Sequence, residues 1–264
     1  MKNKNIAIIA VAIIIILTIS VAVVGNGNNK DDKLYQVSIM QSFMHGAYDG
    51  VISIDDLKSK GDTGLGTFNG VDGEMIILDG VVYQAKTDGS INIITNETTP
   101  FSTITYFDED EKMNLKPAKS FEGLTNQLDK EIKKLGKNNI YVAKIQGNFS
   151  NINVRSIEKQ TKPYKEFTEV AAVDQAVFNY TNQSGTIIAV YFPEYMGELN
   201  MHGWHLHFLN DAKDKGGHVL NLTMNNGTCG IDEINEFELI LPSTSSFKNM
   251  DLSENMTNKI HSVE

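Results

Sequence analysis

Three of the chain's six histidines lie in one short segment, GWHLHFLNDAKDKGGH, which runs from Gly203 to His218. Alternate residues of a β-strand point to the same face, so a strand WHLHFL would present His205 and His207 side by side. The turn-rich connection that follows would return His218 on a neighbouring strand. Three converging imidazoles are the ligand set of an open zinc site, which keeps one position free for water or substrate.

The histidines alone do not determine the metal, because imidazole also binds copper, iron and nickel. Cupin oxygenases carry a similar H-x-H pair on a strand, but they normally place a glutamate a few residues later. This chain has Asn210 and Asp211 there. We therefore predict Zn²⁺ at His205, His207 and His218. A cupin-like oxygenase or isomerase, and a non-catalytic ligand-binding module with structural histidines, remain the alternatives.

Two residue counts add to this pattern. Arg155 is the single arginine among 23 basic residues. A guanidinium group binds a carboxylate through two parallel hydrogen bonds, which an ammonium group cannot do. A bidentate role for Arg155 is one interpretation, and chance in a lysine-rich chain is the other. Cys229 is the only cysteine, so it forms no internal disulfide; we interpret it as a small buried residue in a turn.

Charge and the N-terminus bear on partners and location. The net charge of −10 disfavours a nucleic-acid partner, which would require a basic surface. Ile6 to Val24 is an uncharged apolar run long enough to span a bilayer. We predict residues 1–25 as an anchor or signal segment, which makes the protein exported and gives it its only membrane contact, and residues 26–33 as a polar linker.

The remaining chain predicts an α+β fold with two mixed or antiparallel β-sheet lobes and a few helices. Short apolar runs alternate with Gly, Asp and Asn turns before residue 110, and again after residue 185. Between them, FEGLTNQLDKEIKKLG has leucine and isoleucine at helical spacing and ends at Gly136. We place an N-terminal lobe at 34–150 and a C-terminal lobe, with the metal site on its strands, at 151–264.

Several long motifs then resemble one family, the alpha-acetolactate decarboxylases. They are RSIEKQTKPYKEFTEV and FPEYMGELNMHGWHLHFLNDAKDKGGHVL, supported by GLGTFNGVDGEMIILDGVVYQ, TPFSTITYF and AKIQGNFSNINVRS. The resemblance extends from about residue 34 to the C-terminus. It implies decarboxylation of (S)-2-acetolactate to (R)-acetoin and CO₂ with a histidine-bound metal, and it implies a homodimer.

The resemblance also assigns site residues. The metal ligands fall on the three histidines already chosen by spacing. The family's arginine falls on Arg155, a glutamate on Glu74, a threonine on Thr67 and a C-terminal glutamate on Glu264, with Glu254 as the substitute. Loss of CO₂ would leave an enediolate stabilised by the metal and Arg155, and Glu264 or Glu74 would protonate one face of it. Asn221 stands where an acidic residue is expected, which could alter the orientation of His218.

Overall fold

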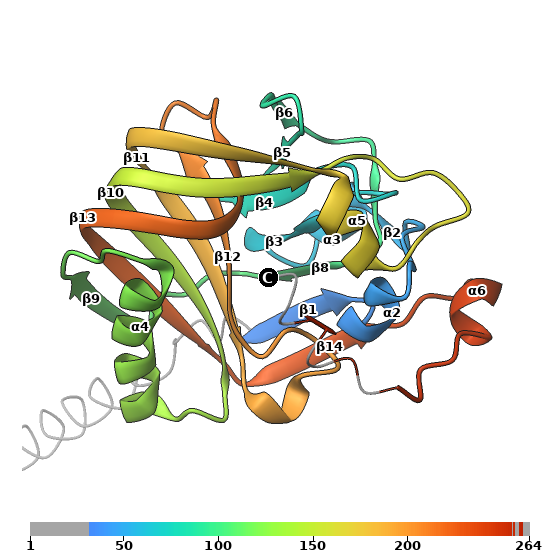
Figure 1. The fold of residues 1–264 in the computed structure, drawn as a ribbon. Coiled ribbons are helices and arrows are strands. Elements are labelled where there is room, and N and C mark those ends of the chain that lie inside the picture. Colours follow the sequence, from blue (N-terminus) through green and yellow to red (C-terminus); the bar gives the residue numbers. More distant parts are fainter. Residues whose placement is uncertain (1–31, 255, 257–258, 261–264) are drawn as a thin grey trace, which may run out of the picture. The chain divides into compact units, whose positions relative to one another are not determined.

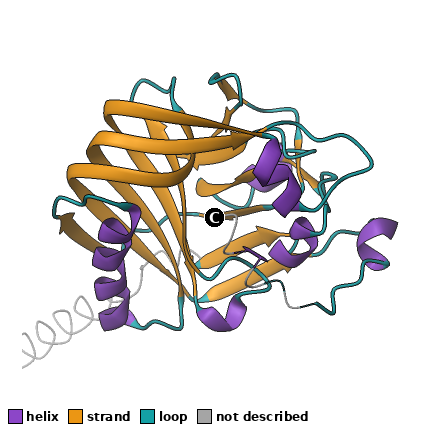
Figure 2. Ribbon diagram, viewed as in Figure 1, coloured by secondary structure: helices purple, strands orange, loops and turns teal. Residues whose placement is uncertain are grey.

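Two β-sheets make up most of the structure, with short helices at their margins (Figures 1 and 2). The structure is a computed structural model that describes residues 32–254, 256 and 259–260. The α+β prediction with two sheets is confirmed. The apolar run Ile6 to Val24 lies outside the described residues, and among those described no helix is long and apolar enough to cross a membrane.

The first sheet has seven strands in the order β14-β1-β8-β3-β4-β5-β6, antiparallel except for the β1–β14 pair. One face of β4 (Glu74–Leu78) packs on α3 (Ile54–Lys58) and the other on the second sheet. Between β4 and β5, Asp79 and Gly80 both have positive φ, which suits a tight hairpin. The strands are β1 (Lys33–Val37), β3 (Thr63–Thr67), β4 (Glu74–Leu78), β5 (Val81–Ala85), β6 (Ile91–Ile93), β8 (Ser102–Thr105) and β14 (Glu236–Ile240).

The second sheet has the order β10-β11-β12-β13-β9, and an additional β10–β13 pairing closes four of its strands into a ring. The largest hydrophobic cluster fills the ring, with residues from all four strands. Its long strands appear at the left of Figure 1. The strands are β9 (Glu111–Leu115), β10 (Ile140–Ile157), β11 (Gln175–Phe192), β12 (Gly203–Asn210) and β13 (Gly216–Ile234).

The predicted amphipathic helix is α4 (Phe121–Leu135), which packs Leu124, Leu128 and Ile132 into the same cluster. The Ser120 hydroxyl caps it by accepting from the Gly123 amide, and it ends at Gly136 as predicted. The smaller elements are β2 (Ile52–Ser53) paired with β7 (Thr98–Thr99), α2 (Met40–Met44), α3 (Ile54–Lys58), α5 (Phe167–Val173), a 3₁₀ turn (Glu194–Met196) and α6 (Ser245–Lys248).

Two sequence predictions need correction. The boundary between residues 150 and 151 falls inside β10, and β14 from the C-terminal part pairs with β1. Strand pairing joins segments distant in the sequence, so the sheets do not divide the chain at one point. Cys229 lies within β13 rather than in a turn, although it is buried as predicted. Burial raises the pKa of its thiol to about 12, which leaves it unreactive.

Candidate metal centre and active site

The three predicted histidines converge between the two sheets. His205 and His207 lie on β12, and His218 lies on β13 directly opposite His207 in the strand register. The Nε2 atom of His205 is 3.1 Å from Nε2 of His207 and 3.0 Å from Nδ1 of His218. All three side chains are buried. The residues of β12 that alternate with the two histidines point to the opposite face, into the ring's interior, as predicted: Trp204, Leu206 and Phe208.

A main-chain contact fixes the orientation of His207. Its Nδ1 atom lies 2.7 Å from the carbonyl oxygen of Met75 on β4, so Nδ1 carries the proton and donates it. Nε2 therefore presents a lone pair to the centre. Burial lowers the pKa of His205 to about 3 and the pKa values of His207 and His218 well below 6.5. All three imidazoles are therefore neutral at physiological pH, the form that binds metals.

These residues fit a divalent metal. A tetrahedral ion with Zn–N bonds of about 2.0 Å would hold its ligand nitrogens roughly 3.3 Å apart, close to the distances observed. The neutral Nε2 of His207 also faces the Glu74 carboxylate oxygen at 3.6 Å. A lone pair and a carboxylate oxygen repel each other unless a cation lies near both. Among the described residues, this triad is the cluster of ligands suited to a metal.

The first sheet brings two further predicted residues to the histidines. Thr67 at the end of β3 and Glu74 at the start of β4 are opposite each other in the register of that hairpin. Glu74 shares its face of β4 with residues that pack on the second sheet, which explains why it is only 8% exposed. The Thr67 hydroxyl donates to the carbonyl of Gly73, which fixes its direction beside the cavity.

Arg155 lies on β10, opposite His218 in the β10–β13 register, and its side chain lines the same cavity. Its guanidinium carbon is 5.9 Å from the centre of the Phe167 ring. The rest of the lining is an apolar wall that sequence analysis missed, because these residues have the spacing and composition of ordinary core: Met40, Phe43, Val71, Phe101 and Phe167. The cavity thus combines one cation, one carboxylate and three imidazoles with an apolar side.

Of three other residues named from the sequence, Glu254 and Asn221 lie away from the histidines. Glu264 lies outside the described residues. The Glu254 side chain is 56% exposed and pairs with Lys259, so it is not at the histidines. Asn221 is exposed and accepts from the Phe121 amide, at the start of α4. The idea that Asn221 orients His218 is therefore wrong, because its side chain points to α4.

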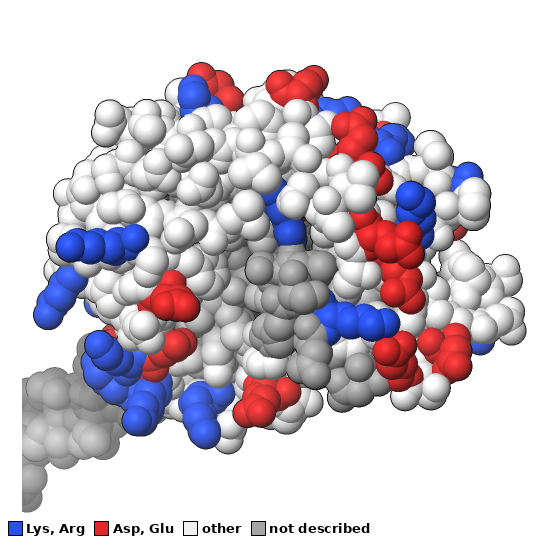
Figure 3. Space-filling view, in the orientation of Figure 1, with Lys and Arg blue, Asp and Glu red and all other residues white. Residues whose placement is uncertain are grey.

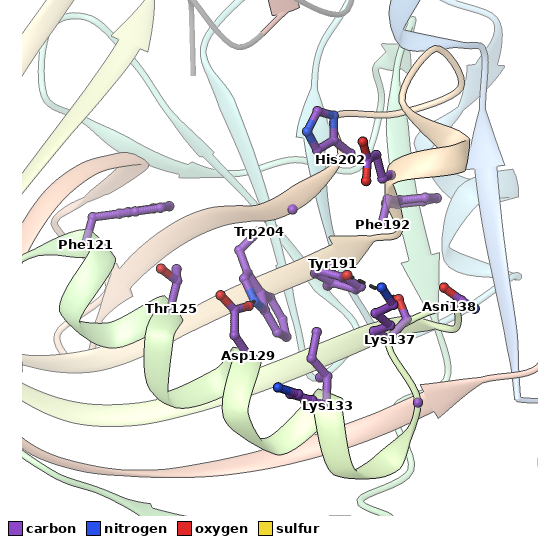
Figure 4. A pocket seen from close by; sticks show the side chains of 14 residues that line it. Phe121, Thr125, Asp129, Lys133, Lys137, Asn138, Tyr191, Phe192, His202 and Trp204 are labelled. Carbon is purple, nitrogen blue, oxygen red and sulfur yellow. Dashed lines mark hydrogen bonds between the residues drawn. The ribbon is translucent and has the colours of Figure 1, made fainter.

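A larger hollow lies elsewhere, between α4 and the ends of β11 and β12, with a volume of about 960 Å³ (Figure 4). The Trp204 indole forms its floor, beside the Tyr191 ring, and donates to Asp129. Basic and acidic side chains mix over α4 (Figure 3). Trp204 is on the face of β12 opposite His205 and His207, so this groove does not reach their nitrogens from that side.

Comparisons with known proteins agree with this site. A model of the family "Alpha-acetolactate decarboxylase" matches residues 34–254. The chain is 41% identical over 238 residues to an alpha-acetolactate decarboxylase of Methanosarcina mazei, covering 90% of this chain and 82% of that protein. It is 38% identical over 232 residues to one of Brevibacillus brevis, covering 88% and 80%.

Solved structures lead to the same family. The crystal structure of alpha-acetolactate decarboxylase from Bacillus subtilis strain 168 superposes with a TM-score of 0.84 at 32% identity, covering 88% of this chain and 99% of that one. The two-sheet fold and the sequence relationship thus extend over nearly the whole described chain. The chain belongs to the alpha-acetolactate decarboxylase family.

Proposed function

We propose that this protein decarboxylates (S)-2-acetolactate to (R)-acetoin and CO₂ with a divalent metal held by His205, His207 and His218. The observation that carries the proposal is the convergence of three neutral imidazoles beside Arg155 and Glu74 in one cavity. The family relationship supplies the substrate.

The reaction needs a place for negative charge. When the carboxylate leaves as CO₂, the electron pair of the broken C–C bond moves toward the neighbouring ketone and gives an enediolate. A divalent ion, when bound, would supply Lewis acidity where that charge develops. Arg155 can hold the substrate carboxylate, and then the enediolate, through charge-assisted hydrogen bonds that strengthen as charge builds up. The apolar wall excludes water and strengthens these interactions.

The second half of the reaction is a proton transfer. One face of the enediolate must be protonated to give a single enantiomer of acetoin, and a carboxylic acid is the suitable donor. We assign this role to Glu264 or Glu74, with the other completing the metal's ligands or orienting the substrate. Thr67, which lines the cavity near Glu74, would hydrogen-bond the substrate.

Zinc is the proposed ion, because three imidazoles with a free fourth position suit tetrahedral Zn²⁺. A cupin-like oxygenase would require iron or manganese and O₂. The test is to supply racemic 2-acetolactate to the purified protein and to follow acetoin by chiral chromatography, with and without O₂. Release of (R)-acetoin from half of the substrate, independent of O₂, is expected. No acetoin from a metal-loaded protein would reject the substrate.

We also propose that the protein is exported and anchored by residues 1–25, or released after their cleavage, and that it forms a homodimer. The apolar run and the family resemblance support these two points respectively. Fractionation of cells with an antibody to the folded part would test the location. Sedimentation analysis of the purified protein would test the dimer; a monomer at micromolar concentration would contradict it.

A further inference from the structure

The chain after β14 returns to the wall of the metal cavity, and one buried side chain holds it there. Gln41 on α2 is only 4% exposed. Its Nε2 donates to two main-chain oxygens of this returning segment, Leu252 O at 2.9 Å and Glu254 O at 2.7 Å. A single amide group thereby satisfies two carbonyls more than 200 residues away in the sequence.

The helix that carries Gln41 also forms part of the cavity. Its start is fixed by main-chain hydrogen bonds from the amides of Met40 and Gln41 to the segment before β12. Met40 and Phe43, on the same short helix, line the cavity around the three histidines. In Figure 1, α2 lies beside α5, which contributes Phe167 to the same wall. Movement of the returning segment would therefore displace side chains of the cavity wall.

Beyond Glu254, the returning segment is anchored by apolar side chains. Met256 and Ile260 are 0% and 1% exposed. They belong to a hydrophobic cluster with Met40, Phe43 and Phe167, the residues that line the cavity. Lys259 adds ion pairs to Glu166 and Glu254 at 3.8 and 3.2 Å, which are exposed and contribute little.

We propose that Gln41 is a positioning residue that docks the returning segment, of which the structure describes residues 250–254, 256 and 259–260, as the outer layer of the substrate cavity. This inference rests on the proposed function and extends it. Docking keeps bulk water from the enediolate.

The test compares Gln41→Met with a matched control, Gln36→Met, both in the full chain. Gln36 is also fully buried, and its Nε2 also donates to two carbonyls, at 2.8 Å each. Its acceptors, Ser38 and Leu199, are not in the returning segment. Gln36→Met also loses a third hydrogen bond, from Asn200 Nδ2 to Gln36 Oε1 at 2.9 Å, so a general loss of stability should affect the control at least as much as Gln41→Met.

For Gln41→Met we expect amide exchange in residues 250–254 to accelerate on the order of tenfold or more, since two buried hydrogen bonds are lost. We also expect kcat to fall on the order of tenfold with bound metal unchanged, and the enantiomeric excess of acetoin to fall, because water then reaches the enediolate. The control should keep its kcat and stereochemistry. Equal kcat and equal enantiomeric excess in the two variants would overturn the proposal.

A second variant covers the case in which Gln41→Met does not fold. Met256→Ala weakens the docking by removing an apolar contact made by the returning segment itself. Faster amide exchange, a lower kcat and a lower enantiomeric excess are again expected. Unchanged stereochemistry would count against the proposal. Exchange in residues 250–254 does not depend on catalysis. If wild-type protein made no acetoin, the proposed function would fail, whereas unaltered exchange in both docking variants would reject the role of Gln41 itself.

Discussion

The Nδ1–H of His207 on β12 donates to the carbonyl oxygen of Met75 on β4, 2.7 Å away. This bond links the two sheets at the metal centre and sets which nitrogen of His207 is available to a metal. Because the acceptor belongs to the main chain of β4, the orientation of the ligand depends on correct packing of the first sheet. Metal binding and the folded state should therefore be thermodynamically linked.

The first prediction concerns that linkage. Zinc should stabilise the folded protein by about 2.7 kcal/mol when its free concentration is 100 times the dissociation constant. Urea unfolding with buffered zinc concentrations measures this directly. His205→Ala should remove the zinc dependence, since it deletes one of three ligands. Unfolding that is independent of zinc in the wild type would contradict a specific site.

The second prediction concerns Glu74, whose carboxylate lies 3.6 Å from His207 Nε2. Glu74→Gln keeps the shape but removes the charge beside the metal centre. We expect metal affinity or activity to fall by about 10- to 100-fold. Competition with a zinc-binding dye, together with kcat/KM, would separate the two effects.

The matched control for Glu74→Gln is Asp72→Asn. Asp72 precedes the same strand but pairs with Lys86 and Lys159 rather than lining the cavity. This control should leave both zinc affinity and kcat/KM near the wild-type values. Equal losses in the two variants would mean that the hairpin, and not the Glu74 carboxylate, matters.

The third prediction concerns Arg155. Arg155→Lys keeps the positive charge but loses the planar pair of donors. Loss of a charge-assisted hydrogen bond costs about 1.5–3 kcal/mol, which lowers kcat/KM by about 10- to 150-fold. Steady-state kinetics would measure it, and circular dichroism would establish that the variant is folded. Full activity in the folded variant would show that bidentate binding is not needed.

The fourth prediction concerns Asp232 on β13, which is 1% exposed. Burial, with added repulsion from Asp110, Asp32 and Asp108, raises its pKa from 3.8 to about 7. Its raised folded-state pKa makes stability greatest below pH 3.8, and that contribution is lost as pH rises toward 7. Asp232→Asn removes this penalty while keeping an acceptor for the Asp108 amide.

At pH 8 we therefore expect Asp232→Asn to be more stable than the wild type, by at most about 4 kcal/mol for a shift of about three pKa units. The difference should shrink steadily from pH 7 to pH 4. Urea unfolding at several pH values measures it. A difference that did not vary with pH would show that Asp232 titrates normally.

Local patterns predicted much of the site. Alternation along WHLHFL placed His205 and His207 on one face, and the turn after them returned His218, because strand geometry relates neighbours along the chain. Glu74 and Thr67 came only from the resemblance, since in isolation they look like solvent-facing residues of a hairpin. No pattern pointed to the Met75 carbonyl or to Gln41, because both act through contacts between distant segments.

The fold shows the same limit. Helix spacing located α4 and its end at Gly136. The sequence did not predict that β9, from the N-terminal part, joins the second sheet, or that β14, from the C-terminal part, joins the first. Strand partners depend on packing across the whole chain. The segment FTEVAAVDQAVFNY has mixed helix and strand patterning because it contains both α5 and the start of β11.

The most direct test of the central claim is one titration on the purified full-length protein. Its metal is removed with a chelator, zinc is added back in steps, and bound zinc and acetoin formation from 2-acetolactate are measured in the same samples. We predict that activity disappears with the metal and returns in proportion to zinc, reaching its maximum at one ion per chain. Acetoin formation that persists without metal, or zinc binding that restores none, would contradict the account.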